Sequence, residues 1–280
     1  MKGILINIYI KLLGFWLNVL AIIHPKYAAK KGFRIFCKPQ RIKLTERQKE
    51  FMRTAELSTM KKDEYPDIQV YKWGNGSKRV LFLHGWQSHS FRWIKYILKL
   101  KQLDYTIYAF DAPASGYSKG EELSVPFYGE VLHEFLNQYG KMDYAVGHSL
   151  GAFTLFLYQK DFNPQAFDKL VSIACPGRAM DFVDLYVDAL KLSKKSVKLI
   201  TDIFVSRFKD PSFYHIENFT SDISIPGLYI HDRGDKEVPF SYTKVLEKNW
   251  SQAEKMYTEG LGHKMRSPEV VDRVVGYLEK

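Results

Sequence analysis

Short apolar runs alternate with amphipathic segments along most of the chain. Apolar runs rich in β-branched and aromatic residues are typical of buried strands, whereas apolar spacings of three and four predict helices. The predicted strands are 68–73, 79–84, 105–110, 143–146, 170–174, 227–230 and 255–257. The predicted helices are 45–57, 91–100, 126–138, 152–158, 241–248 and one that begins at 268. This alternation predicts an α/β fold, with a mostly parallel sheet covered by helices on both faces.

Two segments depart from the simple alternation. Residues 74–77, Gly-Asn-Gly-Ser, predict a turn that joins the first two strands as a hairpin. Residues 177–221 predict two helices, 179–192 and 195–208, with no strand between them. An insertion after the sixth strand, above the carboxyl ends of the strands, would form a small helical lid over an active site. The alternative is an ordinary pair of surface helices.

Residues 3–23 are almost entirely apolar and predict a helix whose surface is covered by lipid or by protein. The exceptions share one narrow stripe of that helix: Gly3, Asn7, Lys11, Gly14 and Asn18. The helix could lie in a membrane interface, span a bilayer, or bury itself against this protein or a second copy. A basic linker follows, so residues 1–44 are expected to form a unit apart from a catalytic domain over 45–280. If the helix spans a membrane, the basic flank puts the catalytic domain on the cytoplasmic face.

The composition narrows the choice of partners. The 280 residues carry 41 Lys and Arg against 31 Asp and Glu, a formal charge of +10, which favours anionic surfaces. No nucleic-acid motif accompanies the basic clusters, so no nucleic-acid partner is expected. Cys37 and Cys175 lie far apart, which argues against a disulfide framework and favours the cytoplasm. Neither cysteine has neighbours at metal-ligand spacing, and we expect no metal site.

The segment Gly147-His148-Ser149-Leu150-Gly151 fits the pattern G-x-S-x-G. A predicted strand precedes it and a predicted helix follows it. A serine on a sharp strand-to-helix turn is held in a strained conformation with its hydroxyl accessible. The first N–H groups of the helix point at whatever that hydroxyl attacks. Ser149 is therefore the candidate nucleophile.

A serine hydroxyl needs a neighbouring base, and the base needs a carboxylate that orients it. His263 follows the last predicted strand in Gly260-Leu261-Gly262-His263 and is the candidate base. Asp235 follows the strand before it and is the candidate orienting carboxylate, with Asp232 as its rival. The backbone N–H groups of Trp86 and Leu150 are the candidate oxyanion hole, because an oxyanion needs two converging donors. We expect His84, His89, His148 and His215 to be structural.

These motifs, in this order, resemble the α/β-hydrolase superfamily of serine hydrolases, especially bacterial lysophospholipase- and carboxylesterase-like members. The matching pieces are His84-Gly85-Trp86, residues 111–118, Gly147 to Gly151, the Asp235 loop with Val238-Pro239, and Gly260 to His263. The resemblance covers residue 68 to the C-terminus. It implies hydrolysis of an ester or thioester through an acyl-enzyme, with no cofactor. Ala114 departs from the pattern, since many relatives have glycine there.

The sequence thus predicts a serine hydrolase that cleaves a small-molecule carboxylic ester, with an acyl or lipid-like substrate favoured by the apolar lid. A thioesterase or acyltransferase would use the same three residues, so these activities remain alternatives. A non-catalytic α/β-hydrolase scaffold used for binding is a third alternative. The expected location is the cytoplasm, where the N-terminal helix could attach the protein to the cytoplasmic face of a membrane.

Overall fold

The computed structural model describes residues 2–63 and 65–280, and it divides into two compact units. The helical unit comprises the chain up to Lys38 together with Arg178–His215. The sheet unit comprises Pro39–Gly177 and Ile216–Lys280. The inserted segment therefore groups with the N-terminal helices, whereas the sequence suggested that it belongs to the catalytic domain. The N-terminal boundary lies at residue 38 rather than 44.

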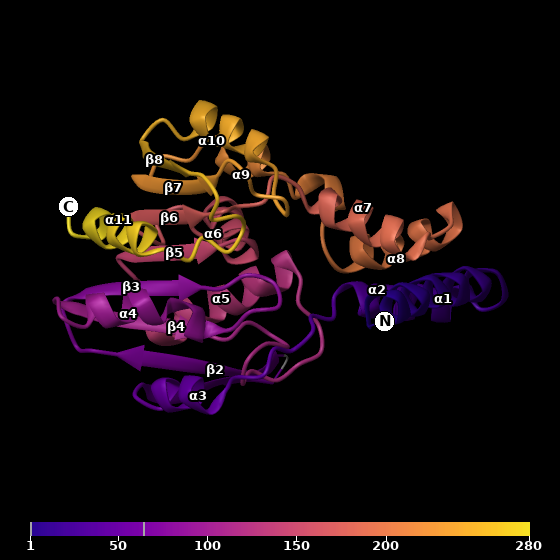
Figure 1. Cartoon of the computed structure of the whole chain (residues 1–280), viewed down its shortest axis with the longest axis horizontal. Helices are drawn as coiled ribbons and strands as arrows, with labels where there is room; N and C mark the ends of the chain where they lie inside the picture. Colours follow the sequence, from indigo (N-terminus) through magenta and orange to yellow (C-terminus); the bar gives the residue numbers. More distant parts are fainter. Residues whose placement is uncertain (1, 64) are drawn as a thin grey trace. The chain divides into compact units, whose positions relative to one another are not determined.

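An eight-stranded sheet forms the centre of the sheet unit (Figure 1). Its strands run in the spatial order β1-β2-β4-β3-β5-β6-β7-β8. The first two pairings in this order are antiparallel and all later ones are parallel. The strands are β1 (Glu56–Lys62), β2 (Tyr65–Trp73), β3 (Lys78–Leu83), β4 (Tyr105–Phe110), β5 (Tyr144–His148), β6 (Lys169–Ile173), β7 (Gly227–Asp232) and β8 (Ala253–Thr258).

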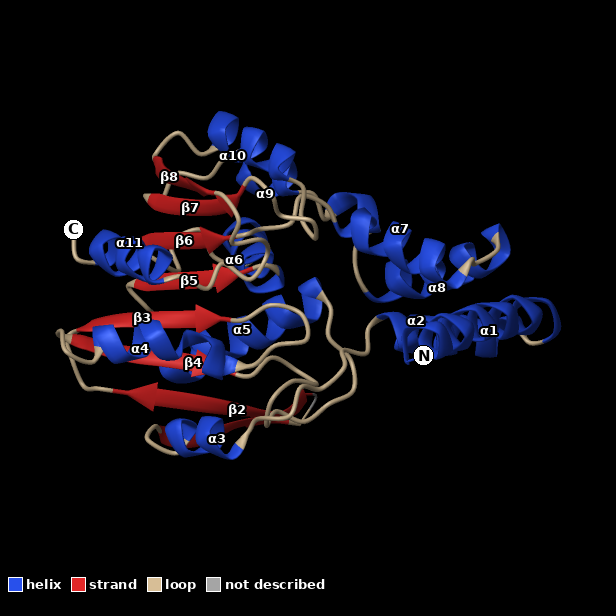
Figure 2. Cartoon of the chain, in the orientation of Figure 1, coloured by secondary structure: helices blue, strands red, loops and turns tan. Residues whose placement is uncertain are grey.

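Helices cover both faces of this sheet, because successive strand residues point to opposite sides and both sides are apolar (Figure 2). On one face, Phe82 and Val146 lie in a cluster with side chains of α3, α4 and α11. On the other face, Phe110 stacks on Phe135 of α5. The helices of this unit are α3 (Glu46–Met52), α4 (Ile94–Leu100), α5 (Val125–Tyr139), α6 (Leu150–Asp161), α9 (Ile216–Thr220), α10 (Thr243–Asn249) and α11 (Pro268–Leu278), with single 3₁₀ turns at Ser90–Trp93 and Phe240–Tyr242.

The predicted hairpin between the strands at 68–73 and 79–84 is wrong. In the structure β2 pairs with β1 and β4, and β3 pairs with β4 and β5. The turn at 74–77 crosses the start of β4, where Ser77 N–H donates to the Asp104 carboxylate (3.0 Å) and Lys78 N–H donates to the Asp104 carbonyl (3.2 Å). These bonds hold the turn against β4, so β4 occupies the place between the two strands.

The helix expected over 45–57 is shorter than the sequence suggested. It begins as predicted, because Thr45 and Gln48 form a reciprocal capping box. It ends at Met52, and β1 begins at Glu56. Residues 56–62 pair antiparallel with β2, and Met60 is the buried side chain of that strand. Tertiary pairing thus overrides the helical propensity of Glu56 and Leu57.

The helical unit contains α1 (Lys2–Ile23), α2 (Pro25–Phe36), α7 (Ala179–Leu190) and α8 (Lys194–Arg207), with a 3₁₀ turn at Pro211–Phe213. α7 and α8 agree with the two helices predicted in the insertion. The prediction of a basic linker after α1 is wrong. This segment forms the helix α2, with Pro25 in its first turn. Its small and apolar residues turn inward: Phe33 lies against Phe204 (6.3 Å between ring centroids), and Gly32 carbonyl accepts from Tyr186 hydroxyl (2.9 Å).

The inserted segment leaves and rejoins the sheet unit at nearly one point. Ile216 N–H donates to the carbonyl of Gly177 (2.7 Å) within the sheet unit. Arg178 and His215, the first and last residues of the insertion, pair as an isolated antiparallel bridge. Backbone hydrogen bonds therefore hold the beginning and the end of the inserted segment side by side.

Candidate active site

Ser149 lies between the end of β5 and the first turn of α6, in a backbone conformation that serine rarely adopts. Its φ is 52° and its ψ is −123°. The turn is tight because small residues surround it: a Cβ on Gly147 would lie 2.5 Å from the Cα of Ala152, and one on Gly151 would overlap the carbonyl of Leu83. Only glycine fits at both positions. The strained elbow expected from G-x-S-x-G is therefore present at Ser149.

A chain of hydrogen bonds joins Ser149, His263 and Asp235. The distance from His263 Nε2 to Ser149 Oγ is 2.9 Å, and the distance from His263 Nδ1 to Asp235 Oδ2 is 2.8 Å. Ser149 and Asp235 expose only 7% and 9% of their surfaces. The structure brings together the three side chains singled out in the sequence, although 114 residues separate Ser149 from His263. With Nδ1–H donated to the carboxylate, Nε2 is left to accept the serine proton.

The Asp235 carboxylate is fixed in its orientation by the backbone of its own loop. Its Oδ1 atom accepts from the N–H groups of Glu237 (2.8 Å) and Val238 (2.9 Å), which leaves Oδ2 for His263. Burial favours a higher pKa for Asp235, but the His263 hydrogen bond and the two backbone donors outweigh it and hold the pKa below its usual value. Asp235 is therefore ionised at neutral pH.

Asp232, the alternative candidate for the orienting carboxylate, bonds to backbone and side-chain donors instead of to His263. It accepts from the N–H of Gly234 (2.9 Å), the hydroxyl of Thr258 (2.8 Å) and the N–H of Leu261 (2.9 Å). These bonds tie the loop that carries Asp235 to the loop that carries His263. Asp232 thus stabilises the relative placement of the two loops, while Asp235 contacts the histidine.

His148 supports His263 in a way that the sequence did not reveal. Its Nε2–H donates to the backbone carbonyl of His263 (2.8 Å). Burial lowers the pKa of His148 well below its usual value, so the ring is neutral. The expectation that His148 is structural agrees with this contact. Its position directly before Ser149 is the only sequence signal, and that signal does not identify the residue that it contacts.

The loop after β3 lies directly against the elbow. A Cβ on Gly85 would be 2.9 Å from the Cβ of Ser149 and 3.0 Å from the carbonyl oxygen of His148. The backbone of His84-Gly85-Trp86 can approach Ser149 because Gly85 has no side chain. Leu150 is the first residue of α6, so its N–H belongs to the unpaired donors of a helix start. Trp86 and Leu150 thus remain the predicted oxyanion donors.

Residues 111–118 form a support loop around the buried carboxylate of Asp111. This carboxylate accepts from Tyr71 hydroxyl (2.8 Å), Ser90 N–H (2.8 Å) and Tyr117 N–H (2.8 Å). Ala114, the departure from the family pattern, has a φ of 59°. Glycine adopts that conformation at no steric cost, which explains why relatives have glycine there. The loop keeps its shape with alanine, at a local cost of about 1 kcal/mol.

Stability is expected to fall as the pH drops from about 6.5 towards 4, in part through His84. Its Nε2 accepts from Ala112 N–H (2.9 Å) and its Nδ1–H donates to the Gly85 carbonyl (2.8 Å), so the native ring is neutral. Burial lowers the pKa of His84 to about 4. The unfolded chain, with a histidine pKa near 6.5, takes up the proton first, and acid therefore favours unfolding. The loss of stability between pH 7 and pH 4 is on the order of 3 kcal/mol.

Thermal unfolding between pH 7.5 and pH 4.5 measures this dependence. A His84→Asn variant is expected to be less stable at pH 7.5 and to show a shallower loss of Tm in acid. His24→Gln, at an exposed histidine, is the control and should follow the wild-type curve. An unchanged slope in the His84 variant would contradict the assignment of acid sensitivity to this ring.

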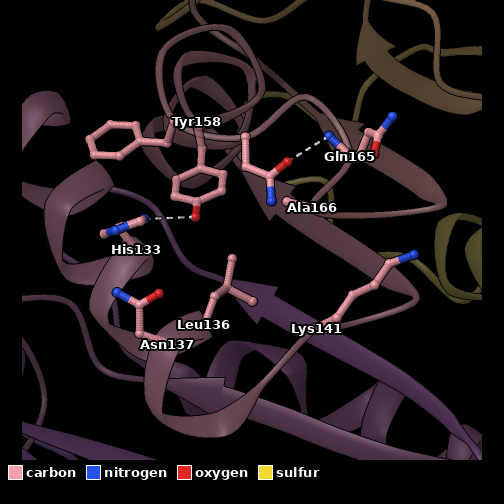
Figure 3. Close-up of a pocket in the computed structure, with 9 residues that line it drawn as sticks. His133, Leu136, Asn137, Lys141, Tyr158, Gln165 and Ala166 are labelled. Atoms are coloured by element: carbon pink, nitrogen blue, oxygen red, sulfur yellow. Dashed lines mark hydrogen bonds between the residues drawn. The ribbon is translucent and has the colours of Figure 1, made fainter.

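Two further features of the molecule bear on where a metal ion or a ligand could bind. Among the described residues, no group of three or more His, Cys, Asp or Glu side chains is placed to hold a metal ion. A depression of about 290 Å³ lies beside α5 and the end of α6, where His133 bonds to Tyr158 hydroxyl (3.1 Å) and Lys141 lines the opposite side (Figure 3). None of Ser149, Asp235 or His263 lines it, so it is not the pocket of the candidate active site.

Several solved structures share this fold. An esterase from Exiguobacterium antarcticum aligns with a TM-score of 0.63 and 17% identity, covering 80% of this chain and 99% of its own. A thioesterase domain from the curacin biosynthetic pathway aligns with a TM-score of 0.59 and 17% identity, covering 80% and 97%. A membrane phospholipase A, described as a bacterial virulence factor, aligns with a TM-score of 0.62 and 16% identity, covering 100% and 98%. At these identities the likeness shows the fold.

No curated protein sequence matches the chain. The family described as alpha/beta hydrolase fold matches residues 78–196, which include β3 and the Ser149 elbow. The sheet order, the matching family and the solved structures agree on one conclusion. The protein has the α/β-hydrolase fold.

Proposed function

We propose that the protein is a serine hydrolase that cleaves a carboxylic ester through an acyl-enzyme. The observation that carries this proposal is the continuous hydrogen-bond chain from Ser149 Oγ through His263 to Asp235. A serine hydroxyl is a weak nucleophile at neutral pH, and this series of hydrogen bonds activates it. Binding alone does not require such an arrangement. Relatives by fold include an esterase and a phospholipase, which agrees with ester chemistry.

In this mechanism Ser149 Oγ attacks the ester carbonyl while His263 Nε2 takes its proton. The ionised Asp235 holds the ring in the Nδ1–H form and stabilises the imidazolium that develops. The N–H groups of Leu150 and Trp86 stabilise the oxyanion, and the start of α6 adds the favourable end of its dipole. His263 then protonates the leaving alcohol. Water, activated by the same ring, attacks the acyl-enzyme and releases the acid.

A thioester is the second candidate substrate, since the same residues and the same steps apply to a thiol leaving group. The fold likeness to a thioesterase domain supports keeping it in the test. An acyltransferase would differ only in the acceptor, with an alcohol or amine in place of water.

Labelling with a fluorophosphonate probe tests the proposal, because this probe reacts with activated serines. We expect a single labelled peptide that contains Ser149, and no labelling of Ser149→Ala. A chain-length series of p-nitrophenyl esters and acyl thioesters then identifies the substrate class. Well-folded wild-type protein that neither reacts with the probe nor hydrolyses any member of the series would overturn the proposal and favour a binding scaffold.

A further inference from the structure

The N-terminal helix α1 contacts its own unit through small and polar residues and through two buried leucines, Leu17 and Leu20. A Cβ on Gly14 would overlap the carbonyl of Leu190, so α1 and the end of α7 touch backbone to backbone. The Asn18 side chain donates to Lys191 carbonyl (3.0 Å) and accepts from Ser193 N–H (2.8 Å) and Ser196 hydroxyl (2.7 Å). Asn18 therefore fastens α1 to the corner between α7 and α8. Two members of the polar stripe noted in the sequence, Gly14 and Asn18, therefore face the other helices of this unit.

The opposite side of α1 is apolar and uncovered within the helical unit. Leu12, Phe15 and Ile22 expose 61%, 68% and 70% of their surfaces. Leu5, Ile6, Ile8, Tyr9 and Ile23 are exposed as well. The segment Leu5–Ile23 is long and apolar enough to cross a membrane by length and composition. A helix in water has its apolar side covered, whereas α1 buries Leu17, Leu20 and Ala21 but leaves most of its other large apolar side chains exposed. A contiguous apolar surface of this kind marks an interaction site.

The charge of the protein is concentrated in the same unit. Residues 1–38 and 178–215 hold 14 Lys and Arg against five Asp and no Glu, which is +9 of the total +10. The sheet unit is nearly neutral, with 27 basic and 26 acidic side chains. Three exposed lysines, Lys191, Lys194 and Lys195, lie at the corner that Asn18 fastens to α1. The apolar surface is thus accompanied by positive charge.

We propose that the helical unit docks on an anionic phospholipid bilayer. The exposed side of α1 enters the acyl-chain region, and the lysines at the α7–α8 corner bind lipid phosphates. Apolar burial and attraction to anionic lipid add together at such a surface. A second copy of the chain fits less well, because two copies would bring +9 against +9. This inference does not depend on the chemistry of Ser149.

Flotation of the full-length protein with vesicles tests the apolar contact. We expect the wild type to float with vesicles of phosphatidylcholine and phosphatidylglycerol, and about tenfold less with phosphatidylcholine alone. Leu12→Glu puts a charge on the exposed side of α1 and is expected to lower the partition coefficient at least about tenfold. Leu98→Glu makes the same change at an exposed leucine of α4 and should float like the wild type.

The lysines are tested by a triple variant, Lys191→Gln, Lys194→Gln and Lys195→Gln. Each lysine near an anionic surface contributes about a fivefold increase in binding, so the triple variant is expected to lose about 100-fold on anionic vesicles. Lys95→Gln, Lys101→Gln and Lys244→Gln, at exposed lysines of the sheet unit, form the matched control.

Three results would overturn the proposal: no flotation of the wild type, equal flotation of Leu12→Glu, or a stable dimer that hides α1 and ignores lipid. Hydrolysis of a soluble short-chain ester, measured on the same samples, reports separately on the proposed function. It is expected to be equal in the wild type and in Leu12→Glu.

Discussion

Ser149→Ala is expected to lower kcat for ester hydrolysis by about a millionfold, to the residual rate that binding and the oxyanion donors supply. The alanine has no hydroxyl to attack the carbonyl, so no acyl-enzyme forms and His263 has no proton to accept. The elbow tolerates the change sterically, since alanine is smaller than serine. The measurement is kcat of the variant on a chromogenic short-chain ester, together with its Tm. A loss of kcat with an unchanged Tm would verify the expectation.

Ser251→Ala, at an exposed serine of the sheet unit, is the control for this measurement and should keep the wild-type rate. If Ser149→Ala retained wild-type turnover after contaminating esterases had been excluded, another residue would be the nucleophile. The hydrogen-bond chain to Asp235 would then need a different explanation.

The second large effect is expected from Asp235→Asn, with a loss in kcat of about 10⁴-fold. The reason lies in how the carboxylate is anchored. Oδ1 accepts two backbone N–H groups, so in the variant the amide oxygen must stay there and the NH₂ group must face His263 Nδ1. A facing donor forces the ring proton from Nδ1 to Nε2. Nε2 can then no longer accept the serine proton. Steady-state kinetics and the ring ¹⁵N shifts of His263 measure the loss and its cause.

Asp232→Asn is the matched comparison, because Asp232 is the last residue of β7 and Asp235 lies in the loop that follows it. Asp232 accepts from Gly234, Thr258 and Leu261 and does not contact His263. Its loss is expected to reduce the free energy of unfolding by about 1–3 kcal/mol and to change kcat much less than Asp235→Asn does. If the two variants exchanged these phenotypes, the assignment of the orienting carboxylate would be wrong.

The sequence predicted best where the chemistry is local. Ser149 lies in a turn that needs glycine on both sides, and Asp235 and His263 each follow a strand whose end is marked by turn residues. Because parallel strands end at the same edge of a sheet, their order along the chain was enough to expect them together. Thr45 as a helix cap is predictable for the same local reason.

Prediction failed where partners far apart in the chain decide the structure. Nothing near residues 74–77 shows that β4 will lie between β2 and β3, since Asp104 supplies the bonds that hold the turn there. The basic segment after Ile23 has the charge of a linker, but its helix is stabilised by Phe204 and Tyr186, which lie more than 150 residues later in the chain. The contact of His148 with His263 is of the same kind.

The bond between Gly177 and Ile216 has a consequence for how this protein can change over evolution. Since the two residues that flank the inserted segment are joined by this bond (2.7 Å), the chain between them can be lengthened, shortened or exchanged without stretching β6 or β7. The elbow that holds Ser149 precedes this junction, and the loops that hold Asp235 and His263 follow it. Selection can therefore alter the length and sequence of the insertion while it leaves the hydrogen-bond chain at Ser149 untouched.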